Sequence, residues 1–325
     1  MNTVFITGAG GFIGRHLVAE LLKRELTIKV LMLDEESVPK SWPSTVQIIR
    51  GDIRHLAKLS DEIGVFDTIF HLAAIVSDWG ARQEHVDITV HGTEQAIALC
   101  LKNNAQFIVT TSIAAFASTL GQGVIDETSP CGKPASNYEY VKQKQEQVTL
   151  DAVKQLGLKA AIIRPANVYG VGSVWVNRFV DLINQQQPVL MGKGDWDAGL
   201  VHVNHVVQIL ILAAEHTQLP SGEVYIIADD PGVTWQQYLG ALSAHLNLPT
   251  AKSIPNLVAK IAAPILEYIG TKTGQKKPPV VTNLAYRLMG VNTIFSNRKA
   301  KQQLGFKPTI NLAQAMAEIK NTHKQ

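Results

Sequence analysis

The stretch that decides the fold lies at the start of the chain and reads TVFITGAGGFIG over residues 3–14. A strand-like apolar run ends at Thr7, and glycines follow at Gly8, Gly11 and Gly14 before an amphipathic helix. In such a unit the first glycine makes a tight turn, the second lets backbone approach a pyrophosphate, and the third lets helix and strand pack closely. Amides at the start of the helix then face the phosphates. The stretch predicts a dinucleotide site.

Acidic residues stand where such a site needs them. Asp34 ends the next predicted strand, twenty residues after Gly14. A carboxylate there binds ribose hydroxyls and repels a 2′-phosphate, so we expect NAD rather than NADP. Glu35 and Glu36 add to this repulsion, whereas the guanidinium of Arg15 beside the turn is able to bind a phosphate.

The first half of the chain alternates short apolar runs with segments of helical period, which is typical of βα units and a parallel sheet. We expect strands at residues 3–7, 29–33, 46–50, 68–72, 107–111 and 160–164, and helices at 14–23, 56–62, 90–102 and 138–156. This pattern predicts an α/β fold, a Rossmann-type doubly wound sheet that binds ligands at the carboxyl ends of its strands. Asp52 and Ile53, after the third strand, are expected near the adenine, with a plain turn as the alternative.

The alternation breaks down after residue 169, so we expect a dinucleotide-binding domain over 1–169 and a smaller, mostly helical substrate lobe over 170–325. Segments around 200–228 are expected to return to the first domain. We expect a helix over 171–193, a second over 203–215, a strand over 222–228, a helix over 234–246 capped by Thr234, an apolar segment over 254–270 interrupted by Pro264, and a closing segment over 311–321.

The composition excludes several classes of protein. The 325 residues are 46% hydrophobic and 18% charged with a net charge of +3, which gives no electrostatic footprint for nucleic acid. Two cysteines, Cys100 and Cys131, are too few for a disulfide framework or a thiolate metal site. The apolar stretch 206–214 is too short to span a bilayer. We therefore expect a soluble cytoplasmic protein that binds a small molecule.

A tyrosine and a lysine four residues apart open the helix expected over 138–156. Tyr138 and Lys142 share one helical face, and so do Tyr140 and Lys144. Two residues along a helix is a rotation of about 200°, so one pair alone can face the ligand edge. Ser112, after the fifth strand, delivers a hydroxyl to the same edge, where it either orients a reacting oxygen or caps a turn.

The first of these pairs has a chemical use. A phenol with a pKa of about 10 is a poor base at neutral pH. A nearby ammonium and an oxidised nicotinamide both stabilise the phenolate, so we expect Lys142 to lower the pKa of Tyr138. The phenol would then take a proton from an alcohol or give one to a carbonyl.

The motifs together resemble the extended short-chain dehydrogenase/reductases, the epimerase/dehydratase group. The similarity covers nearly the whole chain and rests on the glycine turn, GDI at 51–53, HLAA at 71–74, HGT at 91–93, VTTS at 109–112, PASNYEYVK at 134–142, RPANVYG at 164–170, VHV at 201–203 and KAKQQLGFKP at 299–308. The family's proline falls on Pro134 and selects Tyr138 and Lys142 over the second pair, and its serine falls on Ser112.

The resemblance implies catalytic roles for Ser112, Tyr138 and Lys142, with Lys142 also binding the nicotinamide ribose. It also implies a homodimer through the helices at 90–102 and 138–156, and a monomer fits the sequence equally. The residues expected to contact the dinucleotide are Gly8, Gly11, Phe12, Ile13, Gly14, Asp34, Asp52, Ile53, Leu72, Ala73, Ala74, Tyr138, Lys142, Pro165 and Val168.

Departures from the family bear on the substrate. Sugar-nucleotide epimerases of this group hold a diphosphate with two arginines, and the matching places lie near Ala198 and Gly290. Thr89 stands where many members have asparagine. A buried diphosphate without cations is costly, which weakens the sugar-nucleotide interpretation. The residues that could replace the two arginines are Arg178, Lys193, Arg287 and Arg298.

The second half is rich in apolar residues at 254–259, 261–266 and 278–281. With SDWG at 77–80, this resembles the branch that contains the 3β-hydroxysteroid and sterol dehydrogenases. These apolar residues either line a pocket for a greasy alcohol or ketone or only fill the lobe. For residues 257–268 we expect ordinary packing rather than membrane association, because Pro264 interrupts a short segment.

The leading hypothesis is NAD-dependent oxidoreduction of a secondary alcohol or ketone on an apolar or sterol-like substrate. One alternative is an NDP-sugar epimerase or dehydratase with tightly bound NAD, and a second is a dinucleotide sensor without catalysis. His71, His202 and His205 do not have the spacing of a metal site, and no metal is expected.

Overall fold

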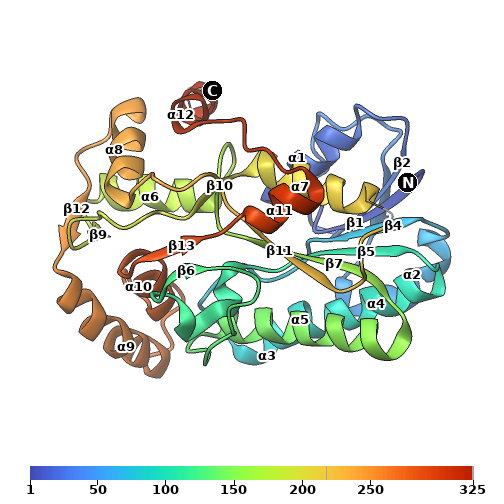
Figure 1. Ribbon diagram of the computed structural model, residues 1–325, viewed down its shortest axis with the longest axis horizontal. Coiled ribbons are helices and arrows are strands. Elements are labelled where there is room, and N and C mark those ends of the chain that lie inside the picture. The colour runs from blue at the N-terminus through green and yellow to red at the C-terminus, as the bar shows by residue number, and fades with distance from the viewer. Residues whose placement is uncertain (217, 324–325) are drawn as a thin grey trace.

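A parallel sheet of seven strands forms the centre of the molecule in the computed structural model, which describes residues 1–216 and 218–323 (Figure 1). Its order is β11-β7-β5-β4-β1-β2-β3, with every neighbouring pair parallel. The strands span Thr3–Thr7 (β1), Thr27–Met32 (β2), Gln47–Arg50 (β3), Thr68–His71 (β4), Gln106–Thr110 (β5), Lys159–Pro165 (β7) and Glu223–Ile227 (β11). The expected doubly wound sheet is confirmed, and the order reverses beside β1, where the glycine turn begins.

Helices cover both faces of this sheet (Figure 1). One face carries α1 (Phe12–Leu21), α7 (Val203–Glu215) and α11 (Arg298–Leu304), and the other carries α2 (Leu56–Ile63), α4 (Gly92–Lys102) and α5 (Asn137–Leu156). Successive side chains of a strand point to opposite faces. Val4 and Ile6 therefore join the apolar cluster beneath α1 and α7, whereas Phe5 joins the cluster beneath α4 and α5.

The second half of the chain adds a lobe at the carboxyl edge of the sheet. It contains α6 (Val174–Asn184), α8 (Trp235–Leu246), α9 (Asn256–Lys272), α10 (Asn283–Met289) and α12 (Leu312–His323). Three pairs of short parallel strands tie the parts together: β8 (Asn167–Tyr169) with β10 (Leu200–His202), β9 (Pro188–Met191) with β12 (Lys252–Ile254), and β6 (Gly123–Ile125) with β13 (Thr293–Phe295). An apolar cluster of its own, including Phe179, Trp235 and Tyr238, fills this lobe.

Two expectations about the second half are wrong. The helix predicted over 171–193 ends at Asn184, because Gln186 has a left-handed φ of 55° and Pro188 lacks the amide that a helix needs. In contrast, α9 runs through Pro264 without a break. Pro264 is exposed, so water can reach the carbonyl that the proline leaves unbonded.

A further departure lies before α4. The chain forms a short helix, α3 (Arg82–His85), and then a π-helical segment, Val86–His91. Such wide turns are rare and often lie at functional sites. Among the described helices, none combines the length and the apolar composition that crossing a bilayer requires.

Candidate active site

The glycine turn is tightly enclosed by backbone. Gly8 has a φ of +69°, and a Cβ there would lie 2.7 Å from the amide nitrogen of Ala73 at the end of β4. A Cβ on Gly14 would lie 2.3 Å from the carbonyl oxygen of Gly8. No side chain caps the N-terminus of α1 at Gly11, which leaves the first amides available to an anion. A side chain at Gly8 or Gly14 would collide with neighbouring backbone, so these glycines allow the close packing of strand, turn and helix that a dinucleotide turn requires.

The acidic residues after β2 differ in their positions. Asp34 is exposed, whereas Glu36 is half-buried and its Oε2 accepts a hydrogen bond of 2.9 Å from the amide of Leu33. Oε1 of Glu36 lies 3.1 Å from where a Cβ of Gly10 would be. The Glu36 carboxylate thus lies beside the glycine turn, a position that sequence spacing did not indicate, and contact of Asp34 with the ribose stays a prediction. Arg15 also lies at the turn, where its Nε donates to the carbonyl of Gly10 at 2.7 Å.

Asp52 and Ile53 both stabilise the fold, Asp52 through hydrogen bonds and Ile53 through packing. Asp52 caps a 3-10 turn by accepting from the amide of Arg54 at 2.8 Å, and it forms an ion pair of 2.5 Å with that guanidinium. Hydrogen bonding by Arg54 lowers the pKa of Asp52. Ile53 is buried and would contact a Cβ on Gly92 at 2.9 Å. Contact of either residue with an adenine stays a prediction.

The other residues expected along the dinucleotide lie at the same edge of the sheet. Leu72, Ala73 and Ala74 follow β4 directly and are half-buried. Pro165 ends β7 and is buried, and Val168 belongs to β8. Phe12 and Ile13 open α1 beside the glycine turn. These positions agree with a dinucleotide that runs across the carboxyl ends of β1, β4 and β7.

The helix that carries the tyrosine–lysine pairs begins at a complete capping box. The hydroxyl of Ser136 accepts from the amide of Glu139, and the Glu139 carboxylate accepts from the amide of Ser136. Arg287 donates to Glu139 at 2.7 Å, although Glu139 is fully buried. The capping box and the Arg287–Glu139 ion pair therefore fix the start of α5, and with it the position of Tyr138.

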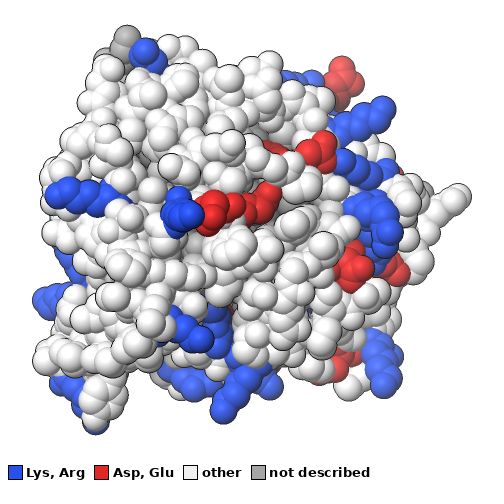
Figure 2. Space-filling model, turned by 60° about the vertical axis from the view of Figure 1, so that its left-hand side comes forward, with Lys and Arg blue, Asp and Glu red and all other residues white. Residues whose placement is uncertain are grey.

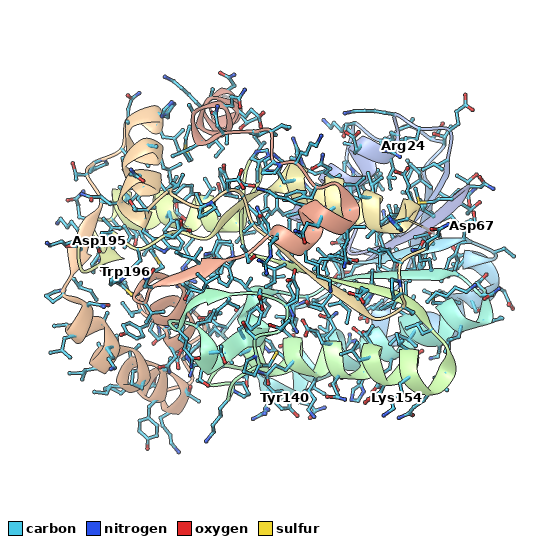
Figure 3. The ribbon with its side chains drawn as sticks, in the orientation of Figure 1. Arg24, Asp67, Tyr140, Lys154, Asp195 and Trp196 are labelled. Carbon is cyan, nitrogen blue, oxygen red and sulfur yellow. The ribbon has the colours of Figure 1, made fainter. Side chains whose placement is uncertain are left out.

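The two tyrosines point in opposite directions. Tyr140 lies on the outer side of α5, where the Arg82 guanidinium is 3.9 Å from its ring centroid (Figure 3). Tyr138 faces inward, and Nζ of Lys142 lies 5.8 Å from its ring centroid. Ser112 hydrogen-bonds to the Tyr138 phenol, and its hydroxyl also accepts from the amide of Ala114 at 3.1 Å. The structure thus brings Ser112, Tyr138 and Lys142 together. Ser112 caps the turn as one of its two expected roles, and orientation of a reacting oxygen stays a prediction.

Burial moves the pKa of Tyr138 in the direction opposite to the shift expected from Lys142 and an oxidised nicotinamide. Burial raises the pKa of Tyr138 to about 12, the hydrogen bond from Ser112 lowers it in part, and the negative charge of Asp78 raises it further. Burial likewise lowers the pKa of Lys142 to about 7, which weakens the ammonium that would stabilise a phenolate. The phenol is therefore held in its protonated form.

Lys142 is almost fully buried, at 2% exposure. Its Nζ donates to the carbonyl of Thr110 at 3.2 Å and to Oε1 of Gln145 at 2.8 Å. One turn further along α5, Glu146 forms a buried ion pair of 2.5 Å with Arg164 of β7. This pair attaches the helix to the sheet, and the Glu146 charge partly offsets the effect of burial on the Lys142 pKa.

A buried chain of hydrogen bonds continues from Gln145 to the glycine turn. Nε2 of Gln145 donates to Oγ1 of Thr93 at 3.0 Å, and this hydroxyl donates to the carbonyl of Thr89 at 2.6 Å. Nε2 of His71 lies 2.9 Å from the same hydroxyl, and Nδ1 lies 2.9 Å from Oγ1 of Thr7. Because the Thr93 proton is committed to Thr89, His71 must donate through Nε2.

The sequence did not predict this buried chain. Burial lowers the pKa of His71 to about 3, so His71 is a neutral part of the scaffold. Thr89, at the expected asparagine position, also accepts from the amide of Ile75 at 3.2 Å. The one available signal was the three-residue spacing of Lys142 and Gln145 on a helix.

An apolar pocket lies in the second-half lobe, and Asp78 in its wall also acts on the Tyr138 phenol through its charge. The Asp78 carboxylate accepts a hydrogen bond from the hydroxyl of Thr282. Asp78, Arg178 and Thr282 are the polar side chains in the pocket wall, and the rest is apolar, including Trp175, Phe179, Leu190, Met191, Val281 and Leu288. Within the part of the chain described, apolar residues at 254 and 280–281 line this pocket, in agreement with one of the two interpretations of that region.

The four cations considered for a diphosphate lie in different places. Arg178 lines the pocket. Arg287 is committed to the buried Glu139, Lys193 is exposed, and Arg298 opens α11. One cation of the four therefore faces the pocket.

His202 and His205, the other two histidines considered for a metal site, form hydrogen bonds that stabilise the fold. His202 caps α7 by accepting from the amide of Asn204 at 3.3 Å, and burial lowers its pKa to about 4. His205 contacts Asp229 at 2.5 Å and accepts from the amides of Thr309 and Ile310. Across the described side chains of residues 1–216 and 218–322, no three His, Cys, Asp or Glu are grouped closely enough to hold a metal.

A doubly wound parallel sheet with a glycine turn at its switch point is typical of dinucleotide-binding proteins. The chain belongs to the NAD-dependent epimerase/dehydratase family, whose model matches residues 4–228. It is thus an NAD(P)-dependent enzyme of the short-chain dehydrogenase/reductase type, and the expected family is confirmed.

Characterised relatives match over nearly the full chain. A 4-hydroxy-2-methyl-3-oxo-4-farnesyl-3,4-dihydroquinoline-1-oxide ketoreductase of Stigmatella aurantiaca is 26% identical, with 97% of this chain and 95% of that protein covered. A 3-beta-hydroxysteroid dehydrogenase of Mycolicibacterium neoaurum is 27% identical, with 98% and 90% covered. The UDP-glucose 4-epimerase of Thermotoga maritima, solved with UDP-glucose, has the same fold, with a TM-score of 0.78, 20% identity and coverage of 99% and 98%.

Proposed function

We propose that the enzyme interconverts a ketone and a secondary alcohol on a largely apolar substrate, with NAD as the hydride carrier. The observation that carries the proposal is the pocket in the second-half lobe, whose wall is apolar apart from Asp78, Arg178 and Thr282. Asp78 links this pocket to the catalytic residues, because its charge acts on the Tyr138 phenol. Apolar surface removed from water contributes roughly 25 cal/mol per Å², so such a wall supplies most of the affinity for a greasy ligand. The ketoreductase and hydroxysteroid dehydrogenase relatives support this substrate class.

The residues take the following roles in this proposal. When bound, the nicotinamide gives or accepts the hydride at the carbonyl carbon. The backbone at Gly8, Gly11 and Gly14 holds the pyrophosphate, and Lys142 binds the nicotinamide ribose. Ser112 orients the reacting oxygen, and Tyr138 gives its phenol proton to that oxygen in reduction or takes one from the alcohol in oxidation.

The protonation state favours reduction as the easier direction. With a pKa of about 12, Tyr138 carries its proton throughout the neutral range and is ready to donate it to a carbonyl. Oxidation needs the phenolate, and the positive charge of an oxidised nicotinamide would have to lower this pKa. The same residues therefore serve both directions, with pH acting mainly on oxidation.

We infer that NAD is preferred over NADP. Two carboxylates support this preference, Glu36 beside the glycine turn and Asp34 after β2, because negative charge repels a 2′-phosphate. Arg15 is exposed at the same turn, and its Nε is already bonded to the carbonyl of Gly10. The two carboxylates outweigh this one cation.

A sugar-nucleotide epimerase or dehydratase is the second candidate. The observation that favours it is the position of Arg178 in the pocket wall, where a guanidinium could meet a phosphate. A diphosphate carries about two charges, and Arg287 is not free to assist because it pairs with Glu139. Arg178 alone supports this candidate weakly.

The test offers the purified enzyme two kinds of substrate. We expect NADH to be consumed with a 3-oxosteroid and UDP-glucose to remain unchanged by NMR. Arg178→Leu serves as the control, because it should leave steroid reduction within about twofold and would abolish turnover of a sugar nucleotide. Formation of UDP-galactose without net consumption of NADH would overturn the proposal in favour of the second candidate.

We further propose the division into residues 1–169 and 170–325, with 200–228 returning to the first part. The separate apolar cluster around Phe179 and Trp235 and the return of β11 to the sheet support it. A homodimer through α4 and α5, as the resemblance implies, stays a prediction that analytical ultracentrifugation tests.

A further inference from the structure

The outward face of α9 consists of large apolar side chains. Six of them are at least half exposed: Leu257 (68%), Val258 (52%), Ile261 (55%), Ile265 (52%), Tyr268 (65%) and Ile269 (50%). The inward face consists of Ala259, Ala263 and Gly270, which are buried. This arrangement corrects the expectation of ordinary packing over 257–268. A surface helix of a globular protein normally turns its large apolar residues inward, and α9 does the reverse.

The helix is held firmly in this orientation. Nε1 of Trp79 donates to the carbonyl of Gln275 at 2.8 Å, and the Trp79 ring covers Gly270 so closely that a Cβ there would lie 2.9 Å from it. Glu267 accepts from the amide of Asn283 at 2.7 Å. At 100° per residue, the six exposed side chains fall within an arc of about 120°. They form one continuous strip, which we call the α9 face.

Positive charge borders the α9 face. Between residues 252 and 277 the chain carries five lysines and one acidic residue, Glu267, which is engaged by Asn283. Within the described chain, none of these lysines forms an ion pair, and all five are exposed: Lys252, Lys260, Lys272, Lys276 and Lys277. Figure 2 turns this end of the molecule forward, and its lower left shows uncharged surface bordered by blue side chains.

We propose that the α9 face docks the enzyme on an anionic lipid bilayer. A helix with a broad apolar strip and flanking lysines lies in the membrane interface, with its apolar side chains among the acyl chains and its ammonium groups at the phosphates. A second copy of the chain is a poor occupant, because two such segments in contact would oppose ten ammonium groups with only the two Glu267 carboxylates, each engaged by Asn283.

The docking surface adjoins the apolar pocket. Ile254, two residues before α9, and Val280, after it, both line that pocket, and Val280 is 39% exposed. A bilayer against α9 would therefore lie next to the pocket wall at Ile254 and Val280. Docking is independent of the activity proposed above, so vesicle binding and turnover test the two separately.

The experiment is co-sedimentation of the full-length enzyme with vesicles. We expect binding to mixed phosphatidylglycerol–phosphatidylcholine vesicles, and weaker binding to pure phosphatidylcholine or at high salt. The variant Leu257→Ser, Ile261→Ser, Ile265→Ser should lower the partition coefficient at least roughly tenfold. Replacing Lys260 or Lys272 by glutamine should lower it about fivefold per residue on anionic vesicles alone.

The matched control changes equally exposed apolar residues elsewhere. Val65 (77% exposed), Val124 (67%) and Leu156 (61%) lie outside α9, so serine at these positions should leave vesicle binding unchanged. Failure of the wild type to bind anionic vesicles, or equal binding by the α9 variant, would overturn the proposal. A dimer in light scattering that the α9 variant abolishes would assign this face to a second copy instead. Unchanged circular dichroism and NADH affinity confirm that each variant is folded.

Discussion

Nζ of Lys142 lies 2.8 Å from Oε1 of Gln145, and Nε2 of Gln145 lies 3.0 Å from Oγ1 of Thr93. The carboxamide thus joins the active-site lysine to a buried polar chain that ends at Thr7, next to Gly8. The chain connects the tyrosine–lysine helix with the dinucleotide turn through fully buried groups. Gln145 positions Lys142 and needs no contact with substrate.

Gln145→Leu is expected to lower kcat about tenfold, because Lys142 loses the carboxamide that holds its ammonium in place. The unpaired groups should also cost about 1–3 kcal/mol of unfolding free energy. If Gln145 served only to stabilise the fold, the dependence of kcat on pH would not change. If Gln145 positions Lys142, its loss shifts the part of the pH profile that is governed by the Lys142 pKa. Gln147→Leu, at an exposed position of the same helix, is the control and should match the wild type. Equal kcat and pH profiles in both variants would contradict this role.

The pH dependence of alcohol oxidation should reveal the charge of Asp78. Oxidation requires the phenolate of Tyr138, so kcat/KM rises with pH by about one decade per unit below the governing pKa. The Asp78 charge raises the pKa of Tyr138, and Asp78→Asn therefore moves this rise to lower pH. The carboxamide oxygen of that variant would still accept the Thr282 hydrogen bond. Asp61→Asn, fully exposed, should leave the profile in place; a shift to higher pH in Asp78→Asn would refute the assignment.

Gly14→Ala is expected to weaken NADH binding by more than about tenfold and to lower stability, because its Cβ would meet the Gly8 carbonyl at 2.3 Å. Gly240 lies inside α8 with no atom within 4 Å of a Cβ. Gly240→Ala should leave NADH affinity unchanged and stabilise the protein by about 0.5–1 kcal/mol. Fluorescence titration and thermal unfolding measure both effects. Normal NADH affinity in Gly14→Ala would show that the dinucleotide does not use this turn.

Glu36 should control cofactor choice more strongly than Asp34. Its carboxylate lies at the glycine turn, so Glu36→Gln removes repulsion of a 2′-phosphate and is expected to raise the NADPH-to-NADH ratio of kcat/KM roughly tenfold. Asp34→Asn, at an exposed position, should have a smaller effect. The reverse order would return the main role to Asp34, as sequence spacing indicated.

Local sequence patterns predicted much of this molecule. The strand 3–7, the helix 203–215 and the Thr234 cap agree with β1, α7 and the start of α8, because each depends on residues close in the chain. The choice of Tyr138 over Tyr140 needed the family proline, since helical spacing allowed both pairs. The structure then places Tyr140 on the outer side of α5.

Long-range contacts could not be predicted in this way. The bond between Gln145 and Thr93 joins residues 52 positions apart, and the contact of His71 with Thr7 spans 64. The position of Glu36 beside the turn depends on a loop conformation that spacing does not encode. The apolar composition of α9 was evident from the sequence. Which face of α9 packs against the lobe could not be predicted, because it depends on a contact with Trp79, far away in the chain.

The central claim is that the Tyr138 phenol transfers the proton at the reacting oxygen. The most direct measurement is the rate of deuteride transfer from deuterated NADH to a 3-oxosteroid by the wild type, Tyr138→Phe and Tyr140→Phe. We expect Tyr138→Phe to lose at least about a hundredfold in rate with NADH affinity unchanged, and Tyr140→Phe to match the wild type. Near-normal transfer by Tyr138→Phe, or loss of transfer in Tyr140→Phe with Tyr138 intact, would contradict the account.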